Sequence, residues 1–121
     1  MSMSEGRILI TGSRDWSDRG AIEAELGEYP PNWVLVHGGA RGADSIAGDV
    51  WWGPVEVHPA DWNRHGRSAG FIRNAEMVAL GADVCLAFIK NESRGATMCA
   101  DLAEKKGIEV RRFLVNDSDN Q

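Results

Sequence analysis

The stretch His37-Gly38-Gly39-Ala40-Arg41-Gly42-Ala43-Asp44 decides the fold. It follows the apolar run Trp33-Val34-Leu35-Val36, which is typical of a β-strand, and it leads into residues 43–50, whose apolar side chains have helical spacing. It is therefore a strand-to-helix turn. Its three glycines allow positive φ angles and leave no Cβ in the way of a ligand. Such a turn is typical of an anion site built from peptide N–H groups, and equally of close strand–helix packing.

Strands and helices alternate along the whole chain. Apolar runs predict strands at residues 7–11, 33–36, 55–57, 83–88 and 108–113. Capping residues and helix breakers predict four helices, the first capped by Ser17 or Asp18 and the others ending near Trp52, near Gly81 and at Lys106. This alternation predicts a Rossmann-like α/β fold, a three-layer α/β sandwich around a five-stranded parallel sheet.

The polarity of the predicted strands sets their order in the sheet. Residues 7–11, 33–36 and 83–88 are nearly continuous apolar runs, as central strands covered on both faces require. The third and fifth strands carry charges, which places them at the edges. The order 3-2-1-4-5 satisfies both conditions most simply. The chain then forms one domain over residues 7–115, between a flexible N-terminus at 1–6 and a disordered polar tail at 116–121.

Composition limits the classes of protein and partner. The 121 residues include 43% hydrophobic and 26% charged residues, and no apolar run is long enough to span a membrane. The first residues lack a secretory signal, which predicts a cytoplasmic protein without a membrane partner. A formal net charge of -5 argues against nonspecific nucleic-acid binding. Cys85 and Cys99 are expected to be buried thiols, and neither they nor the three histidines have metal-ligand spacing, so no metal and no cofactor is expected.

The loops after strands one, two and four meet at the topological switch between strands one and four, where ligands of such sheets bind. Glycines, hydroxyl groups and arginines concentrate in these loops and in the helix that follows residue 66. Arginine binds phosphate or carboxylate groups through a planar set of donors. The predicted ligand-binding residues are Gly12, Ser13, Arg14, Trp16, Gly38, Gly39, Ala40, Arg41, Gly42, Asp44, Asp61, Arg67, Arg73, Asn74, Ser93, Arg94, Gly95 and Thr97.

Two of these residues have alternative roles. Trp16 can stack on a base or ribose, or it can cover the first helix as part of the core. The core-facing side predicted for the helix after residue 66 comprises Ala69, Ile72, Ala75 and Ala79. Arg73 lies outside that arc, so it is expected to reach a ligand phosphate or to pair with an acid such as Asp44 or Asp61.

Five segments, taken in order, resemble the YspA-like branch of the SLOG superfamily. They are Thr11-Gly12-Ser13-Arg14-Asp15-Trp16, the turn 38–44, Pro59-Ala60-Asp61-Trp62, the run 66–74 with Met77, and Ser93-Arg94-Gly95-Ala96-Thr97. This superfamily joins the LOG-type, lysine decarboxylase-like phosphoribohydrolases with the DprA-type recombination mediators. The resemblance implies a Rossmann-like fold with a pocket for a nucleotide-derived ligand. For this branch it implies a role in sensing or handling such ligands, often in phage and bacterial conflict.

The resemblance to the LOG-type enzymes is looser. Arg73 matches an arginine of their middle helix, but Asn74 stands where they have a lysine, and residues 98–100 stand where their catalytic glutamate is expected. Cleavage of an N-glycosidic bond normally needs such a carboxylate. Asp44 and Asp61 are the candidates that could replace it. We therefore favour binding over catalysis.

The sequence leaves three functions open. The first is a binding module that senses or sequesters a nucleotide-derived, phosphorylated small molecule. The second is a nucleoside-phosphate hydrolase or LOG-like phosphoribohydrolase. The third, DprA-like single-stranded DNA binding, is disfavoured by the acidic charge balance. A homodimer is a further expectation, because Trp51 and Trp52 cannot both face the core from one helix.

Overall fold

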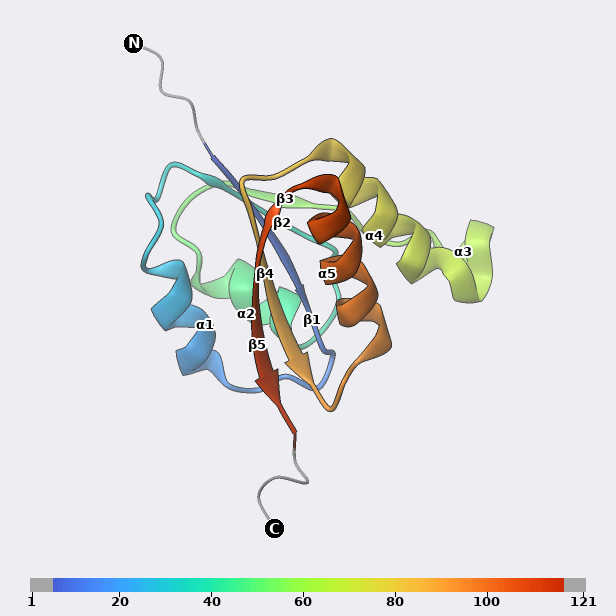
Figure 1. Cartoon of the computed structure of the whole chain (residues 1–121), viewed down its shortest axis with the longest axis horizontal. Helices are drawn as coiled ribbons and strands as arrows, with labels where there is room; N and C mark the ends of the chain where they lie inside the picture. Colours follow the sequence, from blue (N-terminus) through green and yellow to red (C-terminus); the bar gives the residue numbers. More distant parts are fainter. Residues whose placement is uncertain (1–5, 117–121) are drawn as a thin grey trace.

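The computed structural model of the chain describes residues 6–116. It has three layers, a central sheet and a layer of helices on each of its faces (Figure 1). The sheet consists of β1 (Arg7–Gly12), β2 (Val34–His37), β3 (Val55–Val57), β4 (Val84–Lys90) and β5 (Glu109–Val115). All pairings are parallel, and the order is β3-β2-β1-β4-β5. The predicted Rossmann-like α/β fold and its strand order are therefore confirmed.

The predicted termini fall almost wholly outside the part of the chain that the structure describes. Residues 1–5 and 117–121 lie outside it. Gly6 lies inside it, is buried beside the indole of Trp33, and accepts a hydrogen bond from Val34 N–H at 2.9 Å. The contact between β1 and β2 therefore extends one residue before the predicted domain boundary.

Burial of the strands explains their order. Residues 8–11 of β1 and all of β4 except Lys90 are buried, as expected for strands with helices on both faces. The edge strand β5 is largely exposed, and its Arg111 pairs with Glu25 and Glu109, both at 3.0 Å. Charges on an edge strand also discourage pairing with the strands of other molecules.

The helices lie on both faces of the sheet (Figure 1). Helices α1 (Arg19–Leu26) and α2 (Ala43–Val50) cover one face, and α4 (Ala69–Leu80) and α5 (Arg94–Lys106) cover the other. Side chains alternate along β1, so that Ile8 and Ile10 pack with α1 and α2 whereas Leu9 packs with α4 and α5. Asp18, one of the two predicted caps, accepts a hydrogen bond from Ala21 N–H and begins α1.

The segment predicted as a long loop after β3 contains a short helix. This helix, α3 (Trp62–His65), is followed by a 3₁₀ turn, η1 (Gly66–Ser68), and then by α4. Asp61 accepts a hydrogen bond from Arg64 N–H at 3.1 Å and thereby caps α3. Figure 1 shows α3 at the periphery, beside the N-terminal end of α4. The predicted four-turn helix is therefore divided, and its regular part has 12 residues.

The predicted core-facing side of α4 is correct for Ala69 and wrong for Ala75 and Ala79. Its buried residues are Ala69, Arg73, Asn74, Met77 and Val78, whereas Ala75 and Ala79 are exposed. The prediction assumed that charged groups stay outside, because burial of an unpaired charge is strongly unfavourable. Arg73 escapes this rule because its guanidinium group is hydrogen-bonded where it is buried.

Five other side chains have clear positions. Trp16 is 4% exposed and belongs to the core, where its ring meets Phe88 edge-on with 5.4 Å between centroids. Trp51 is buried and donates to Trp33 O at 3.1 Å, whereas Trp52 is 91% exposed. Cys85 and Cys99 are buried free thiols, as predicted. Trp16 is therefore a core residue and not a platform for a ligand.

Within residues 6–116, no helix has both the length and the apolar character that crossing a membrane requires.

Replacing Trp16 tests this assignment. Trp16→Ala is expected to lower the free energy of unfolding by about 3–5 kcal/mol, because it leaves a large cavity beside Phe88. Trp52→Ala removes an indole that contacts solvent, so a change within about 0.5 kcal/mol is expected. Urea denaturation followed by circular dichroism measures both. Equal losses in the two variants would contradict the placement of Trp16 in the core.

Candidate functional site

A cleft of about 660 Å³ lies at the carboxyl-terminal edge of the sheet, beside the ends of β1 and β4. Its walls come from the loop after β1, the turn before α2, the segment α3–η1–α4 and the start of α5. The predicted ligand-binding residues that line it are Gly12, Arg14, Ala40, Arg41, Asp44, Arg67, Arg73, Asn74, Ser93 and Gly95. Segments far apart in sequence thus meet near the topological switch of the sheet, where the fold favours a ligand.

Positive charge in this cleft lacks internal partners. Among the described residues, no carboxylate lies within salt-bridge distance of the exposed Arg14, Arg41 or Arg67. Of the six arginines outside the cleft, Arg7, Arg19, Arg111 and Arg112 are paired with carboxylates at 2.9 to 3.0 Å, whereas Arg64 and Arg94 form no salt bridge with a described residue. With Arg73, four guanidinium groups line the cleft against two carboxylates, in a chain of net charge -5. Such a local excess of positive charge attracts anions.

Arg73 forms part of the cleft wall and holds three segments together. Arg73 is only 8% exposed. Its Nη1 donates to the carbonyl oxygen of Gly38 and, at 3.2 Å, to the carbonyl oxygen of His58. Its Nε donates to Asn74 Oδ1 at 2.8 Å. A Cβ on residue 38 would lie 2.2 Å from Nη1, so only glycine allows this approach. The predicted ion pair of Arg73 with Asp44 or Asp61 does not form.

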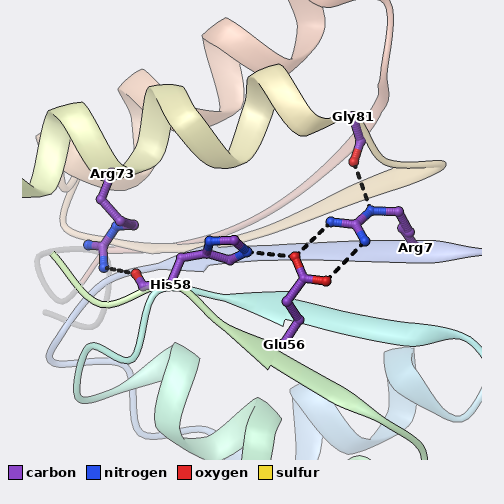
Figure 2. A network of polar contacts seen from close by, with 5 residues as sticks. All are labelled: Arg7, Glu56, His58, Arg73 and Gly81. Carbon is purple, nitrogen blue, oxygen red and sulfur yellow. Dashed lines mark hydrogen bonds and ion pairs between the residues drawn. The ribbon is translucent and has the colours of Figure 1, made fainter.

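A polar network supports this position of Arg73 (Figure 2). His58, whose carbonyl accepts from Arg73, has its ring Nε2 at 2.6 Å from Glu56 Oε2. Glu56 also accepts two bonds from the Arg7 guanidinium at 3.0 and 3.1 Å, and Arg7 Nε donates to Gly81 O. These bonds from Arg7 and His58 lower the pKa of Glu56 to about 2. The loop after β3 is thereby tied to β1 and to both the middle and the end of α4.

The peptide N–H groups of the glycine turn are engaged within the protein. Asp44 Oδ2 accepts from Gly38 N–H at 3.0 Å and from Ala40 N–H at 3.3 Å, and His37 Nδ1 accepts from Gly39 N–H at 2.9 Å. The prediction that these amides bind an anion is therefore wrong for residues 38–40. A buried carboxylate already takes the place that an external anion would occupy.

The start of α5 provides amides that remain open. The first hydrogen bond of this helix runs from Thr97 N–H to Ser93 O, so the amides before Thr97 have no partner within the helix. Ser93 makes no side-chain cap bond, and the first turn contains no acidic residue. Ser93, Gly95 and Ala96 line the cleft. Asn74 Nδ2 donates to Gly95 O at 3.4 Å and links this helix to α4.

Two aromatic side chains at the cleft are more exposed than such groups usually are. Trp62 is 50% exposed and Phe71 is 41% exposed, and both line the cleft. The guanidinium carbon of Arg14 lies 5.5 Å from the centroid of the Trp62 ring, within range of a cation–π interaction. Phe71 was not among the predicted site residues, because the helical spacing puts it beside the predicted core-facing side.

Several predicted site residues have structural roles. The Ser13 hydroxyl accepts from Lys90 N–H at 2.7 Å and thereby joins the loops after β1 and β4. Gly42 has a φ of +78°, and a Cβ there would lie 2.3 Å from Ser13 O, so close packing alone requires this glycine. Asp61 caps α3, and it does not line the cleft.

The other predicted residues lie beside the cleft. Gly38 and Gly39 line a smaller hollow that shares Arg14, Arg41 and Arg73 with it. Arg94 and Thr97 line a different hollow, between α5 and β5. The residues at the start of α5 therefore divide between the two hollows. Ser93, Gly95 and Ala96 line the cleft, and Arg94 and Thr97 do not.

Asp44 is an unusual carboxylate for its surroundings. It is 5% exposed, and its Oδ1 is buried without a hydrogen-bond partner. Burial raises the pKa of Asp44 to about 6, although the amides of Ala40 and Gly38 and the charges of Arg73 and Arg14 act to lower it. Carboxylates with raised pKa values in clefts are typical of functional sites. Among residues 6–116, no group of three histidine, cysteine or acidic side chains is arranged to hold a metal ion.

The structural role of Arg73 can be measured directly. Arg73→Met is expected to lower the free energy of unfolding by about 1–3 kcal/mol, because it leaves the carbonyls of Gly38 and His58 without their donor. Arg67→Met is the matched control, since Arg67 is exposed and pairs with no described carboxylate. It should change the free energy of unfolding by less than about 0.5 kcal/mol. Urea denaturation compares the two. Equal stability of both variants would show that Arg73 is not a structural tie.

The pKa of Asp44 predicts a pH dependence of stability. Below about pH 4 the carboxyl group is protonated in the folded and unfolded states alike, and above about pH 6 the folded state carries a buried charge. Its contribution to the free energy of unfolding therefore becomes less favourable as the pH rises between these values, by up to about 3 kcal/mol. Asp44→Asn keeps an oxygen for Gly38 and Ala40 and removes the charge, so a gain of about 1–3 kcal/mol is expected at pH 7.5.

The same substitution should have little effect at pH 4, where the wild-type carboxyl group is neutral. Asp49→Asn, on the exposed side of α2, controls for a change of charge on the same helix. Urea denaturation at pH 4 and pH 7.5 gives the comparison. A gain for Asp44→Asn that is equal at both pH values would rule out the raised pKa as its cause.

Comparison with known proteins agrees with this architecture. Residues 6–65, which run from the start of β1 through α3, match the family described as YspA, cpYpsA-related SLOG family. The Gene 61 protein of Mycobacterium phage D29 is 51% identical to this chain in an alignment that covers 88% of this chain and 95% of that protein. No solved structure is significantly similar to the chain. The chain therefore belongs to the YspA, cpYpsA-related SLOG family.

Proposed function

We propose that the protein binds a nucleotide or nucleotide-derived, phosphorylated small molecule in the cleft and acts as a sensor or sequestering module. The observation that carries this proposal is the set of uncompensated guanidinium groups, Arg14, Arg41 and Arg67, around the open start of α5. Unpaired cations and unpaired amides are both complementary to phosphate.

The phosphate end of the ligand belongs at α5. The amides of Gly95 and Ala96 lie at the positive end of the helix dipole, and Arg67 and Arg14 line the same cleft. The glycine turn before α2 contributes its shape and Arg41 instead of its amides, which Asp44 and His37 already occupy. Arg94 takes no part, because it lines a different hollow.

The base or sugar of the ligand belongs on the aromatic side chains. Trp62 and Phe71 come from α3 and α4, on the side of the cleft formed by these helices. Large aromatic groups that are half exposed at a cleft can stack on a nucleobase, an interaction that contributes about 1–3 kcal/mol per base. This stacking role passes to Trp62 and Phe71, since Trp16 is part of the core.

Family membership and the phage relative support a role in conflict between phage and bacterium. The SLOG family is associated with nucleotide-related binding, and the Gene 61 protein that resembles this chain belongs to a mycobacterial phage. A homodimer remains a prediction, and Trp52 is the exposed indole that a second copy would cover.

A hydrolase is the second candidate function, and one observation favours it. Asp44 lines the cleft with a pKa of about 6, a value suited to a general base near neutral pH. Asp61 is a weaker candidate, because its carboxylate caps α3 outside the cleft. Single-stranded DNA binding has the least support, because the net charge of -5 opposes a long phosphate track.

A panel of nucleotides tests the proposal. The expected result is that adenosine or guanosine 5′-monophosphate raises the melting temperature, whereas adenosine without phosphate does so much less. Arg67→Gln should weaken binding of the same nucleotide about tenfold, because a charge-assisted phosphate contact is lost. Arg111→Gln on β5 is the matched control and should bind as the wild type does.

Chromatography of the same mixtures separates binding from catalysis. Stabilisation without a new product supports the binding module, and release of a free base or of ribose phosphate supports the hydrolase. Equal stabilisation by adenosine and by its monophosphate would contradict a phosphate site, as would an Arg67→Gln variant that binds unchanged.

A further inference from the structure

Asp44 holds an oxygen acceptor that the protein itself does not use. Its Oδ2 accepts from the amides of Gly38 and Ala40, which fixes the orientation of the carboxylate. Its Oδ1 is buried and has no partner, and it is the one such side-chain atom found among the described residues. The residue lines the cleft. One oxygen of this carboxylate therefore closes the glycine turn, and the other oxygen, on a residue that lines the cleft, has no partner in the described residues.

An acceptor in this state is uncommon in a folded protein. Most buried polar side-chain atoms have at least one hydrogen-bond partner, because an unsatisfied one loses the full free energy of its hydration. Arg73 and Arg14 are close enough to influence the charge of Asp44, yet neither guanidinium lies within 4.0 Å of its oxygens. The nearest cations of the protein thus leave Oδ1 unpaired.

The chemistry of Oδ1 limits what can bind it. A carboxylate oxygen accepts hydrogen bonds and repels other anions, so a ligand phosphate does not belong beside it. The uncharged hydrogen-bond donors of a nucleotide include the sugar hydroxyls and the amino group of the base. Asp44 and the arginines of the cleft therefore recognise different parts of one molecule.

We propose that Oδ1 of Asp44 accepts a hydrogen bond from an uncharged donor of the bound ligand, a sugar hydroxyl or a base amino group, and so selects nucleotides that carry this donor. The inference rests on the proposed function of the cleft. Because Oδ1 is closed to bulk water, the donor reaches it after a rotamer shift in the cleft wall, a change that is common at binding surfaces.

Analogues that lack one donor each identify the source. Isothermal titration with wild-type protein compares adenosine 5′-monophosphate with its 2′-deoxy and 3′-deoxy analogues, and with purine riboside 5′-monophosphate, which lacks the 6-amino group and gains no donor in its place. Guanosine 5′-monophosphate is compared in the same way with its deoxy analogues and with inosine 5′-monophosphate, which lacks the 2-amino group. Removal of the group that binds Oδ1 is expected to weaken binding about tenfold or more, because it leaves a charged acceptor unpaired.

Asp44→Asn shows whether Asp44 is the residue that makes this distinction. The amide keeps an oxygen for Gly38 and Ala40 but presents an N–H₂ donor where Oδ1 was. The variant is therefore expected to bind the parent nucleotide about tenfold more weakly and to bind the discriminating analogue about as well as the parent. Asp49→Asn, exposed on the same helix, should retain the wild-type preference.

Three results would overturn the inference. Wild-type protein that binds every analogue as tightly as its parent nucleotide has no such donor site. An Asp44→Asn variant that keeps the wild-type preference assigns the preference to another residue, and one that binds all phosphorylated probes more tightly shows that Asp44 only repels the phosphate. A wild-type protein that binds no nucleotide at all contradicts the proposed function itself, which separates that failure from the first three.

Discussion

The geometry of the cleft depends on the burial of the Arg73 guanidinium group against Gly38. This one side chain joins α4 to the turn after β2 and to the loop after β3, through the carbonyls of Gly38 and His58. The contact requires the absence of a Cβ at residue 38. A guanidinium group is suited to this role, because it stays charged and can donate five hydrogen bonds in a fixed plane. The walls of the cleft are therefore set by a charged residue and not by apolar packing alone.

The two glycine-rich helix starts of this fold have different roles. The turn before α2 is closed by Asp44 and His37, so that its amides are satisfied inside the protein. The start of α5 has no acidic residue in its first turn and no side-chain cap, and its residues Ser93, Gly95 and Ala96 line the cleft. An anion placed at α5 is attracted by the helix dipole and by Arg67 and Arg14 together. The helix start available to an anion is therefore the one after β4, and not the glycine turn after β2.

Asp44 links the stability of the domain to the chemistry of the cleft. It satisfies two amides of the glycine turn, yet its burial with an unpaired oxygen raises its pKa and opposes folding at neutral pH. Unfavourable local interactions of this kind concentrate where proteins bind ligands or act on them, because the same group gains when the ligand arrives. The same carboxylate thus stabilises the turn before α2 through one oxygen and offers the other oxygen as an acceptor for a ligand.

Much of the architecture could be predicted from the sequence alone. The alternation of apolar runs with amphipathic segments, and the charges of the third and fifth strands, were sufficient for the fold, the strand order and the edge of the sheet where the cleft lies. These features depend on periodicity and on the burial of apolar surface, which are local properties of the chain. The recruitment of Arg14, Arg41 and Arg67 to one cleft follows from the same topology.

The roles of individual polar groups were decided only by the tertiary structure. The sequence left Trp16 with two alternative roles, and it did not show that α4 buries Arg73 or that Asp44 closes the glycine turn. The buried charge of Arg73 is satisfied by the carbonyls of Gly38 and His58, which are distant from it in sequence, and no local pattern shows that these partners exist. The sequence by itself therefore determined the framework and the place of the cleft. Only the packing of distant segments decided which arginines and amides are used within the protein and which remain for a ligand.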